Sequence, residues 1–283
     1  MSKLHAGAGA PGKKSIVVAL HCSGSSGRQW NKLASALGER CRLIAPDLIR
    51  SPAVAQWRAG RPFRLADETA PLVDIVDALD GPVHLVGHSY GGAVALRLAC
   101  ERPARIAGLS LYEPSAFFLL QWMGAQGRPA LQEIQSLAAG VTRDVAAGDD
   151  SAAARRFVDY WNGAGAWDGM KMQPKAELMN YMPKAPLEFG ALLDEPTRPF
   201  AFSRLTCPVL LMRGLRGPTP TARIAQELRT IMRNAVLEEM RDAGHMGPLS
   251  HAERVSEMIA AHVSRAAGLD RLPERDARRQ AVA

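Results

Sequence analysis

Residues 84–95 read His-Leu-Val-Gly-His-Ser-Tyr-Gly-Gly-Ala-Val-Ala and carry the pattern Gly-x-Ser-x-Gly at Gly87, Ser89 and Gly91. A short apolar run precedes this pattern, and an Ala-rich segment of helical period follows it. A sharp turn from strand to helix brings backbone close to the serine, so a Cβ at either glycine would clash. The stretch therefore predicts a strained strand–turn–helix unit that holds the Ser89 hydroxyl above a sheet.

Similar short apolar runs recur along the chain, each bounded by Gly, Pro or polar residues, as buried parallel strands are. They are Ser15–Leu20, Arg42–Ala45, Val83–Val86, Ile106–Tyr112, Val209–Met212 and Ala235–Met240. Segments of helical period lie between them, at Gln29–Leu37, Leu65–Leu79, Gly92–Glu101, Ala222–Met232 and Ser250–Ala267. Because strand and helix alternate, we expect an α/β fold with a parallel sheet of about six strands and helices on both faces.

One gap breaks this alternation. Residues 115–204 contain no strand-like run, but they hold Ala-rich helical stretches and many large apolar side chains. We expect a helical cap here, inserted into a core of residues 15–114 and 205–267, above the carboxyl ends of the strands where ligands bind. Residues 1–14 are predicted to be a flexible lead-in, and residues 268–283 a loose tail.

Composition narrows the class of protein and its partners. Apolar residues make up 47% of the chain and charged residues 22%, the balance of a globular protein with a sizeable core. The formal charge of +7 comes from scattered Lys and Arg, with much of the excess near the two ends, so we expect no nucleic-acid partner. The four cysteines have no paired spacing, and no leader or membrane-spanning run is evident. We expect a cytoplasmic monomer or homodimer without metal, cofactor or stable membrane association.

Several loops resemble those of the α/β-hydrolase superfamily, and the resemblance covers nearly the whole chain from Ser15 to Ala267. Leu20-His21-Cys22-Ser23-Gly24 resembles the family's His-Gly loop, and Ala45-Pro46-Asp47-Leu48 resembles its Pro-Asp step. Asp242-Ala243-Gly244-His245-Met246-Gly247-Pro248 resembles the loop that bears the catalytic histidine. The resemblance implies a serine hydrolase in which Ser89 is the nucleophile. We expect the family's opening antiparallel hairpin to be missing.

Two backbone amides are predicted to form an oxyanion hole. The helix after Ser89 points its N-terminal amides at the place where negative charge develops on an attacked carbonyl, which makes the Tyr90 amide one donor. The resemblance implies that the amide of Ser23, in the His-Gly loop, is the second donor. Cys22 replaces the usual glycine of that loop.

A serine hydroxyl is a weak nucleophile near neutral pH and needs a general base, for which histidine has a suitable pKa. His245 follows the last predicted strand, lies between Gly244 and Gly247, and comes last in the chain order Ser, acid, His. We expect His245 to be the base. His251, at the start of the next helix, is its rival.

The third catalytic residue orients the imidazole and stabilises its charged form, so it must be a carboxylate. The resemblance implies an aspartate beyond the fifth parallel strand, in a Gly-x-x-Asp pattern, but this chain has Gly217 there. Some family members carry the acid after the preceding strand, which ends here at Glu113. A buried, unpaired charge at that strand end would cost several kcal/mol. Glu113 is therefore predicted to be the acid, with Asp242 and Asp194 as alternatives.

The cap is rich in Met and aromatic residues, which form adaptable apolar pockets. Phe117, Trp122 and Trp161 are predicted to line such a pocket. We therefore expect hydrolysis of a small-to-medium hydrophobic or aromatic ester through an acyl-enzyme on Ser89. One alternative is a carbon–carbon bond hydrolase of ring-cleavage products, whose members usually carry Asn before the nucleophile, where this chain has His88. The other is a ligand-binding receptor on a hydrolase fold.

Overall fold

A computed structural model describes residues 14–49 and 61–269, so the predicted lead-in, apart from Lys14, and the tail beyond residue 269 lie outside the described residues. The described residues form one six-stranded sheet in the order β2-β1-β3-β4-β5-β6, and every neighbouring pair is parallel. The strands are β1 (Ser15–Leu20), β2 (Cys41–Ile44), β3 (Val83–His88), β4 (Ile106–Tyr112), β5 (Val209–Gly214) and β6 (Ala235–Met240). These strands confirm the predicted α/β class and parallel sheet.

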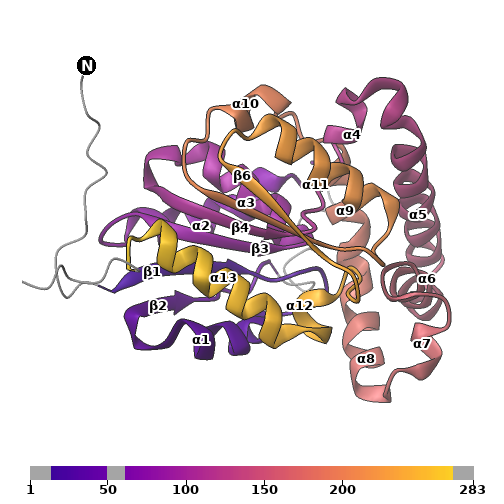
Figure 1. Cartoon of the computed structure of the whole chain (residues 1–283). Coiled ribbons are helices and arrows are strands. Elements are labelled where there is room, and N and C mark those ends of the chain that lie inside the picture. The colour runs from indigo at the N-terminus through magenta and orange to yellow at the C-terminus, as the bar shows by residue number, and fades with distance from the viewer. Residues whose placement is uncertain (1–13, 50–60, 270–283) are drawn as a thin grey trace, which may run out of the picture.

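Helices cover both faces of the sheet (Figure 1). On one face lie α1 (Asn31–Leu37) and α13 (Ala252–Ala266), and on the other lie α2 (Leu65–Asp77), α3 (Tyr90–Glu101) and α11 (Thr219–Ile231). Alternation along β1 explains the two layers, because successive side chains of a strand point to opposite faces. Val17 and Ala19 pack with the α1 and α13 layer, whereas Val18 and Leu20 pack in the opposite layer.

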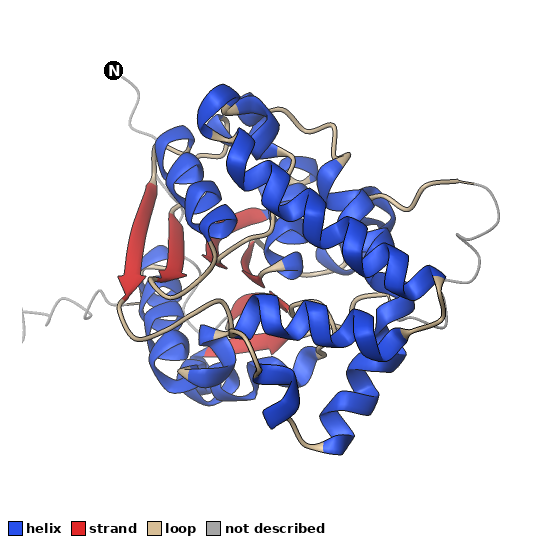
Figure 2. Cartoon of the chain, turned by 90° about the vertical axis from the view of Figure 1, so that its right-hand side faces the viewer, coloured by secondary structure: helices blue, strands red, loops and turns tan. Residues whose placement is uncertain are grey.

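Between β4 and β5 the chain leaves the sheet and forms the helical segment predicted as a cap. Its helices are α4 (Leu119–Trp122), α5 (Arg128–Ala146), α6 (Asp150–Asn162), α7 (Ala166–Gly169), α8 (Met172–Tyr181), α9 (Ala185–Leu193) and α10 (Pro199–Ser203). In Figure 1, α5 to α9 stand beyond one end of the sheet, and Figure 2 shows this side of the molecule facing the viewer.

Short helical turns complete the described structure. The helix α12 (Gly247–Ser250) follows β6, and single 3-10 turns occur at η1 (Gly27–Trp30), η2 (Gly38–Arg40), η4 (Pro103–Arg105), η5 (Gly124–Gln126) and η6 (Met182–Lys184). The carboxyl ends of parallel strands meet at one edge of a sheet. The loops after β1, β3, β4 and β6 therefore come together under the helical segment, and they carry the predicted site residues.

Candidate active site

Ser89 lies between β3 and α3 in a strained backbone conformation, with φ 54° and ψ −119°. Close backbone contacts explain the glycines around it. A Cβ on Gly91 would lie 2.4 Å from the carbonyl oxygen of His21, and a Cβ on Gly87 would lie 2.6 Å from the carbonyl oxygen of Gly91. These contacts confirm the clash inferred from the sequence. Ser89 is only 6% exposed, and side chains of the helical segment line the cavity that reaches it.

Ser89, His245 and Glu113 form one hydrogen-bonded line. The distance from His245 Nε2 to Ser89 Oγ is 2.9 Å, and that from His245 Nδ1 to Glu113 Oε2 is 2.7 Å. A carboxylate only accepts hydrogen bonds, so Nδ1 carries the proton and Nε2 is left to accept the Ser89 hydroxyl. The structure therefore brings together the three side chains predicted as nucleophile, base and acid.

Glu113 follows β4 directly and has a left-handed backbone with φ 40°. Its carboxylate is fully engaged: Oε1 accepts the Gly214 amide at 2.9 Å, and Oε2 accepts the Thr221 hydroxyl at 2.8 Å as well as His245. A Cβ on Gly217 would lie 2.5 Å from Glu113 Oε1. The glycine at the position where the family usually has its aspartate thus leaves the space that the Glu113 carboxylate fills.

The alternative residues lie elsewhere. Asp242 is exposed, and its carboxylate oxygens lie 3.2 Å from Arg254 and 3.4 Å from His251 Nε2. His251 and Asp242 therefore pair with one another at the surface instead of meeting Ser89. Asp194 is exposed at the end of α9. None of these three forms a hydrogen bond with His245 or Ser89 within the described part of the chain.

Two buried side chains fix the loop that carries His245. The Tyr112 hydroxyl donates to the Gly244 carbonyl at 2.8 Å, and His88 Nε2 donates to the His245 carbonyl at 2.8 Å. His88 Nδ1 in turn accepts from the Gln29 side-chain amide at 3.1 Å. Burial lowers the pKa of His88 well below its ordinary value, so this ring stays neutral. This supporting role of His88 could not be predicted from the sequence.

The His21 ring orients the predicted oxyanion loop. His21 Nε2 accepts the Leu48 amide at 3.0 Å, so Nδ1 carries the proton and donates to the Cys22 carbonyl at 2.8 Å. In a trans peptide the carbonyl and the next N–H point in opposite directions, so this bond also fixes the direction of the Ser23 amide. Within the described residues, neither the Ser23 nor the Tyr90 amide donates a hydrogen bond to the protein. Neither amide is thus engaged by residues 14–49 or 61–269, as the predicted oxyanion hole requires.

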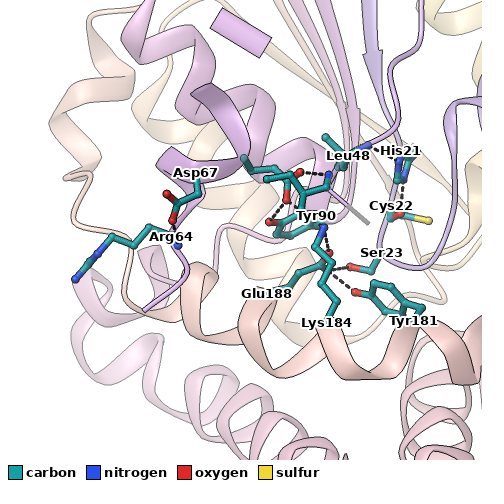
Figure 3. Close-up of polar contacts among 12 residues, drawn as sticks. His21, Cys22, Ser23, Leu48, Arg64, Asp67, Tyr90, Tyr181, Lys184 and Glu188 are labelled. Carbon is teal, nitrogen blue, oxygen red and sulfur yellow. Dashed lines mark hydrogen bonds and ion pairs between the residues drawn. The ribbon is translucent and has the colours of Figure 1, made fainter. Parts of the chain in front are cut away.

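A buried ion cluster lies beside this loop and joins the helical segment to the core (Figure 3). Lys184 Nζ lies 3.0 Å from Glu188 Oε1 and 3.1 Å from Glu68 Oε2, and the three side chains are at most 4% exposed. Hydroxyl groups complete the cluster: Tyr90 donates to Glu68 at 2.9 Å, and Ser23 donates to Glu188 at 2.5 Å. Tyr181 also donates to Glu188. This cluster could not be predicted from the sequence, although Lys184 and Glu188 have the i,i+4 spacing of a helical ion pair.

Replacing Lys184 with Met is expected to lower the free energy of unfolding by about 3–5 kcal/mol near pH 7.5, because two buried carboxylates lose their cation. Burial already raises the pKa of Glu68, and losing Lys184 raises it further. In the folded variant Glu68 then keeps a proton that it releases in the unfolded chain. The stability of the variant therefore falls as the pH rises above the pKa of Glu68 in the unfolded chain. Urea unfolding should therefore show a smaller loss of stability for Lys184→Met near pH 5 than near pH 7.5.

Lys32→Met is the matched control, because Lys32 forms an exposed ion pair with Glu253. It should leave the unfolding midpoint nearly unchanged at both pH values. An equal loss of stability for Lys184→Met near pH 5 and near pH 7.5 would contradict a buried pair of carboxylates as its cause.

Aromatic side chains line the cavity that reaches Ser89. Phe117 and Trp161 both line the cavity that reaches Ser89, and their rings stack with centroids 6.4 Å apart. The Trp161 ring also stacks on His245, with centroids 4.2 Å apart. Both residues therefore occupy the place predicted for pocket residues.

The prediction for Trp122 is wrong. Its side chain is 55% exposed, and its ring lies 5.7 Å from the guanidinium of Arg198. The helix α4 has a single turn, in which Leu119 and Leu120 are buried and Trp122 points to the surface. Trp122 lines neither cavity that reaches Ser89.

The chain belongs to the alpha/beta hydrolase family, whose model matches residues 17–258. Lipase LipV of Mycobacterium tuberculosis is 39% identical over 116 residues, a match that covers 40% of this chain and 42% of the lipase. The pimeloyl-(acyl-carrier protein) methyl ester esterase of Chromobacterium violaceum is 27% identical over 257 residues, which cover 87% of this chain and 93% of the esterase. MenH from S. aureus has a similar fold, with a TM-score of 0.68 and 16% identity over 91% of this chain and 96% of that chain.

No group of three or more His, Cys, Asp or Glu side chains in residues 14–49 and 61–269 is arranged to hold a metal ion. No helix in the same residues has the length and hydropathy needed to cross a bilayer.

Proposed function

We propose that this hydrolase cleaves a small-to-medium hydrophobic or aromatic ester through an acyl-enzyme on Ser89, with His245 as general base and Glu113 as the acid. The supporting observation is the unbroken line from Ser89 Oγ to His245 at 2.9 Å and on to Glu113 at 2.7 Å. The esterase from Chromobacterium violaceum, which matches most of the chain, is consistent with this activity.

Acylation begins when Ser89 Oγ attacks the ester carbonyl carbon and His245 Nε2 takes the hydroxyl proton. The carbonyl oxygen gains negative charge and lies against the free amides of Ser23 and Tyr90. The carboxylate of Glu113 stabilises the protonated imidazole. The intermediate collapses when the bond to the alcohol oxygen breaks and His245 gives its proton to that oxygen.

Deacylation repeats these steps with water. His245, now neutral, takes a proton from a water molecule that attacks the acyl carbon of the Ser89 ester. The second intermediate collapses with return of the proton to Ser89 Oγ, and the carboxylic acid leaves. Ser89 and His245 thereby return to the hydrogen-bonded state seen in the structure.

Steady-state hydrolysis of 4-nitrophenyl acetate and 4-nitrophenyl butyrate tests the proposal. We expect saturable turnover of at least one ester, well above the rate in buffer or with heat-denatured protein. A folded protein that binds these esters without hydrolysing them would contradict the proposal and would favour a ligand-binding receptor.

A further inference from the structure

Ser89 lies at the junction of two cavities of very different size. The inner cavity has a volume of about 10 Å³, room for about one water molecule. The outer cavity has a volume of about 600 Å³. Ser23, Ser89, Phe157 and Trp161 line both cavities.

The inner cavity is lined mostly by buried side chains. Beyond the shared residues, its walls are Ser115, Phe117, Tyr181, Ala185, Glu188, Phe189 and Leu192. Phe117 stacks between Trp161 and Phe189, with centroids 6.4 Å apart on both sides. Phe117, Phe189 and Leu192 are each at most 5% exposed and belong to the main hydrophobic core. Because a close-packed core does not expand freely, the wall sets a firm size limit.

The outer cavity opens to solvent. Several of its lining residues are exposed, among them Asn162, Pro174, Glu177, Leu249 and Ser250. The remainder are mostly apolar, including Val158, Met170 and Leu178. A bulky apolar group can therefore enter and leave on this side of Ser89.

The position of His245 assigns the two halves of an ester to the two cavities. His245 must give its proton to the oxygen of the leaving alcohol, so that half of the ester lies on the His245 side of Ser89. His245 and Met246 line the outer cavity, and neither lines the inner one. The acyl half, bonded to the same carbonyl carbon, points the other way and enters the inner cavity.

We infer that the substrate is an ester of a short acyl group, close to acetyl in size, with a larger apolar alcohol or phenol. This inference rests on the proposed ester hydrolysis at Ser89 and adds which half of the substrate is small. A methyl group is close to the size of the inner space, whereas an aryl or long alkyl acyl group would displace Phe189 or Leu192.

Two isomeric esters test the inference, because they contain the same atoms in opposite arrangement. Benzyl acetate places the ring on the alcohol, and methyl phenylacetate places it on the acyl group. After each kcat/KM is divided by the ester's rate of hydroxide hydrolysis, we expect the acetate to be favoured by about 100-fold. Hexyl acetate and methyl heptanoate form a second isomeric pair with the same expected order.

The outcomes separate this inference from the proposed function. Equal or reversed normalised values, with both esters hydrolysed, would overturn the assignment of the cavities and leave ester hydrolysis intact. If no ester in either pair is hydrolysed and Ser89 resists fluorophosphonates, both the inference and the proposed function fail.

Matched Leu→Ala variants test the assignment independently. Leu192→Ala enlarges the inner cavity and should raise the butyrate-to-acetate ratio of kcat/KM by about tenfold. Leu178→Ala makes the same change in the outer cavity and should alter preference among alcohols while leaving that ratio unchanged. The opposite pattern would overturn the inference. Should Leu192→Ala fail to fold, Phe189→Leu enlarges the same cavity with a smaller loss of packing.

Discussion

Ser89→Ala is expected to lower kcat for ester hydrolysis by about 10⁴-fold or more and to retain the native fold. The variant removes the oxygen that is proposed to form the acyl-enzyme, and within the described residues no other hydroxyl group forms a hydrogen bond with His245 Nε2. Alanine keeps the Cβ, so the left-handed backbone at φ 54° gains no new steric strain. Initial rates on a 4-nitrophenyl ester, with melting curves of both proteins, measure the two effects separately.

Ser115→Ala is the matched control for this variant. The Ser115 hydroxyl lies 3.1 Å from Ser89 Oγ and is buried in the same cavity. Its removal costs one neutral hydrogen bond, so kcat should fall by no more than about tenfold. If Ser115→Ala abolished turnover and Ser89→Ala did not, the nucleophile would be misassigned.

Glu113→Gln is expected to lower kcat by about 10²–10⁴-fold while the fold is retained. The amide has nearly the same shape as the carboxylate, but it cannot stabilise a protonated His245. Both Glu113 oxygens accept hydrogen bonds in the structure. In either orientation of the glutamine amide, its NH₂ group therefore faces another hydrogen-bond donor. Steady-state kinetics should show the loss in kcat, with a smaller change in KM.

Asp242→Asn is the control for Glu113→Gln. Asp242 begins the loop that carries His245, but it is exposed and pairs with Arg254. Its neutral variant should keep nearly the wild-type kcat. A large loss in Asp242→Asn together with wild-type kcat in Glu113→Gln would transfer the acid role to Asp242.

An aspartate at position 217 should partly replace the carboxylate of Glu113. A Cβ on Gly217 would lie 2.5 Å from Glu113 Oε1, so an aspartate at position 217 fits only after the glutamate side chain is shortened. Glu113→Ala should be as inactive as Glu113→Gln. Adding Gly217→Asp to Glu113→Ala should restore part of the activity, whereas Gly217→Asp alone should lower activity by crowding two carboxylates.

The sheet and the turn at Ser89 could be predicted from the sequence because local rules determine them. Each strand is a short run of apolar residues bounded by turn residues, and this local pattern alone indicates a buried strand. The glycines of the pattern Gly87, Ser89, Gly91 are likewise required locally, because neighbouring backbone lies too close to the turn for a Cβ. Glu113 could be chosen as the acid because a carboxylate at the end of an apolar strand requires a partner.

Features that depend on the packing of distant segments could not be predicted. The direction of Trp122 is set by which side of the single-turn helix α4 meets the core, and a turn that short has no clear hydrophobic period. The ion cluster joins Glu68 in α2 to Lys184 and Glu188 in the helical segment, residues that no motif connects. The support of His245 by His88 likewise appears only when the loops after β3 and β6 meet.

Fluorophosphonate labelling followed by peptide mass spectrometry tests whether Ser89 is the activated nucleophile of a serine hydrolase. We expect one adduct per chain, located on Ser89, which forms more slowly with a competing ester present and does not form in Ser89→Ala. An adduct on Ser23, Ser25 or Ser115 in the native protein, or no adduct in protein shown to be folded, would contradict this expectation.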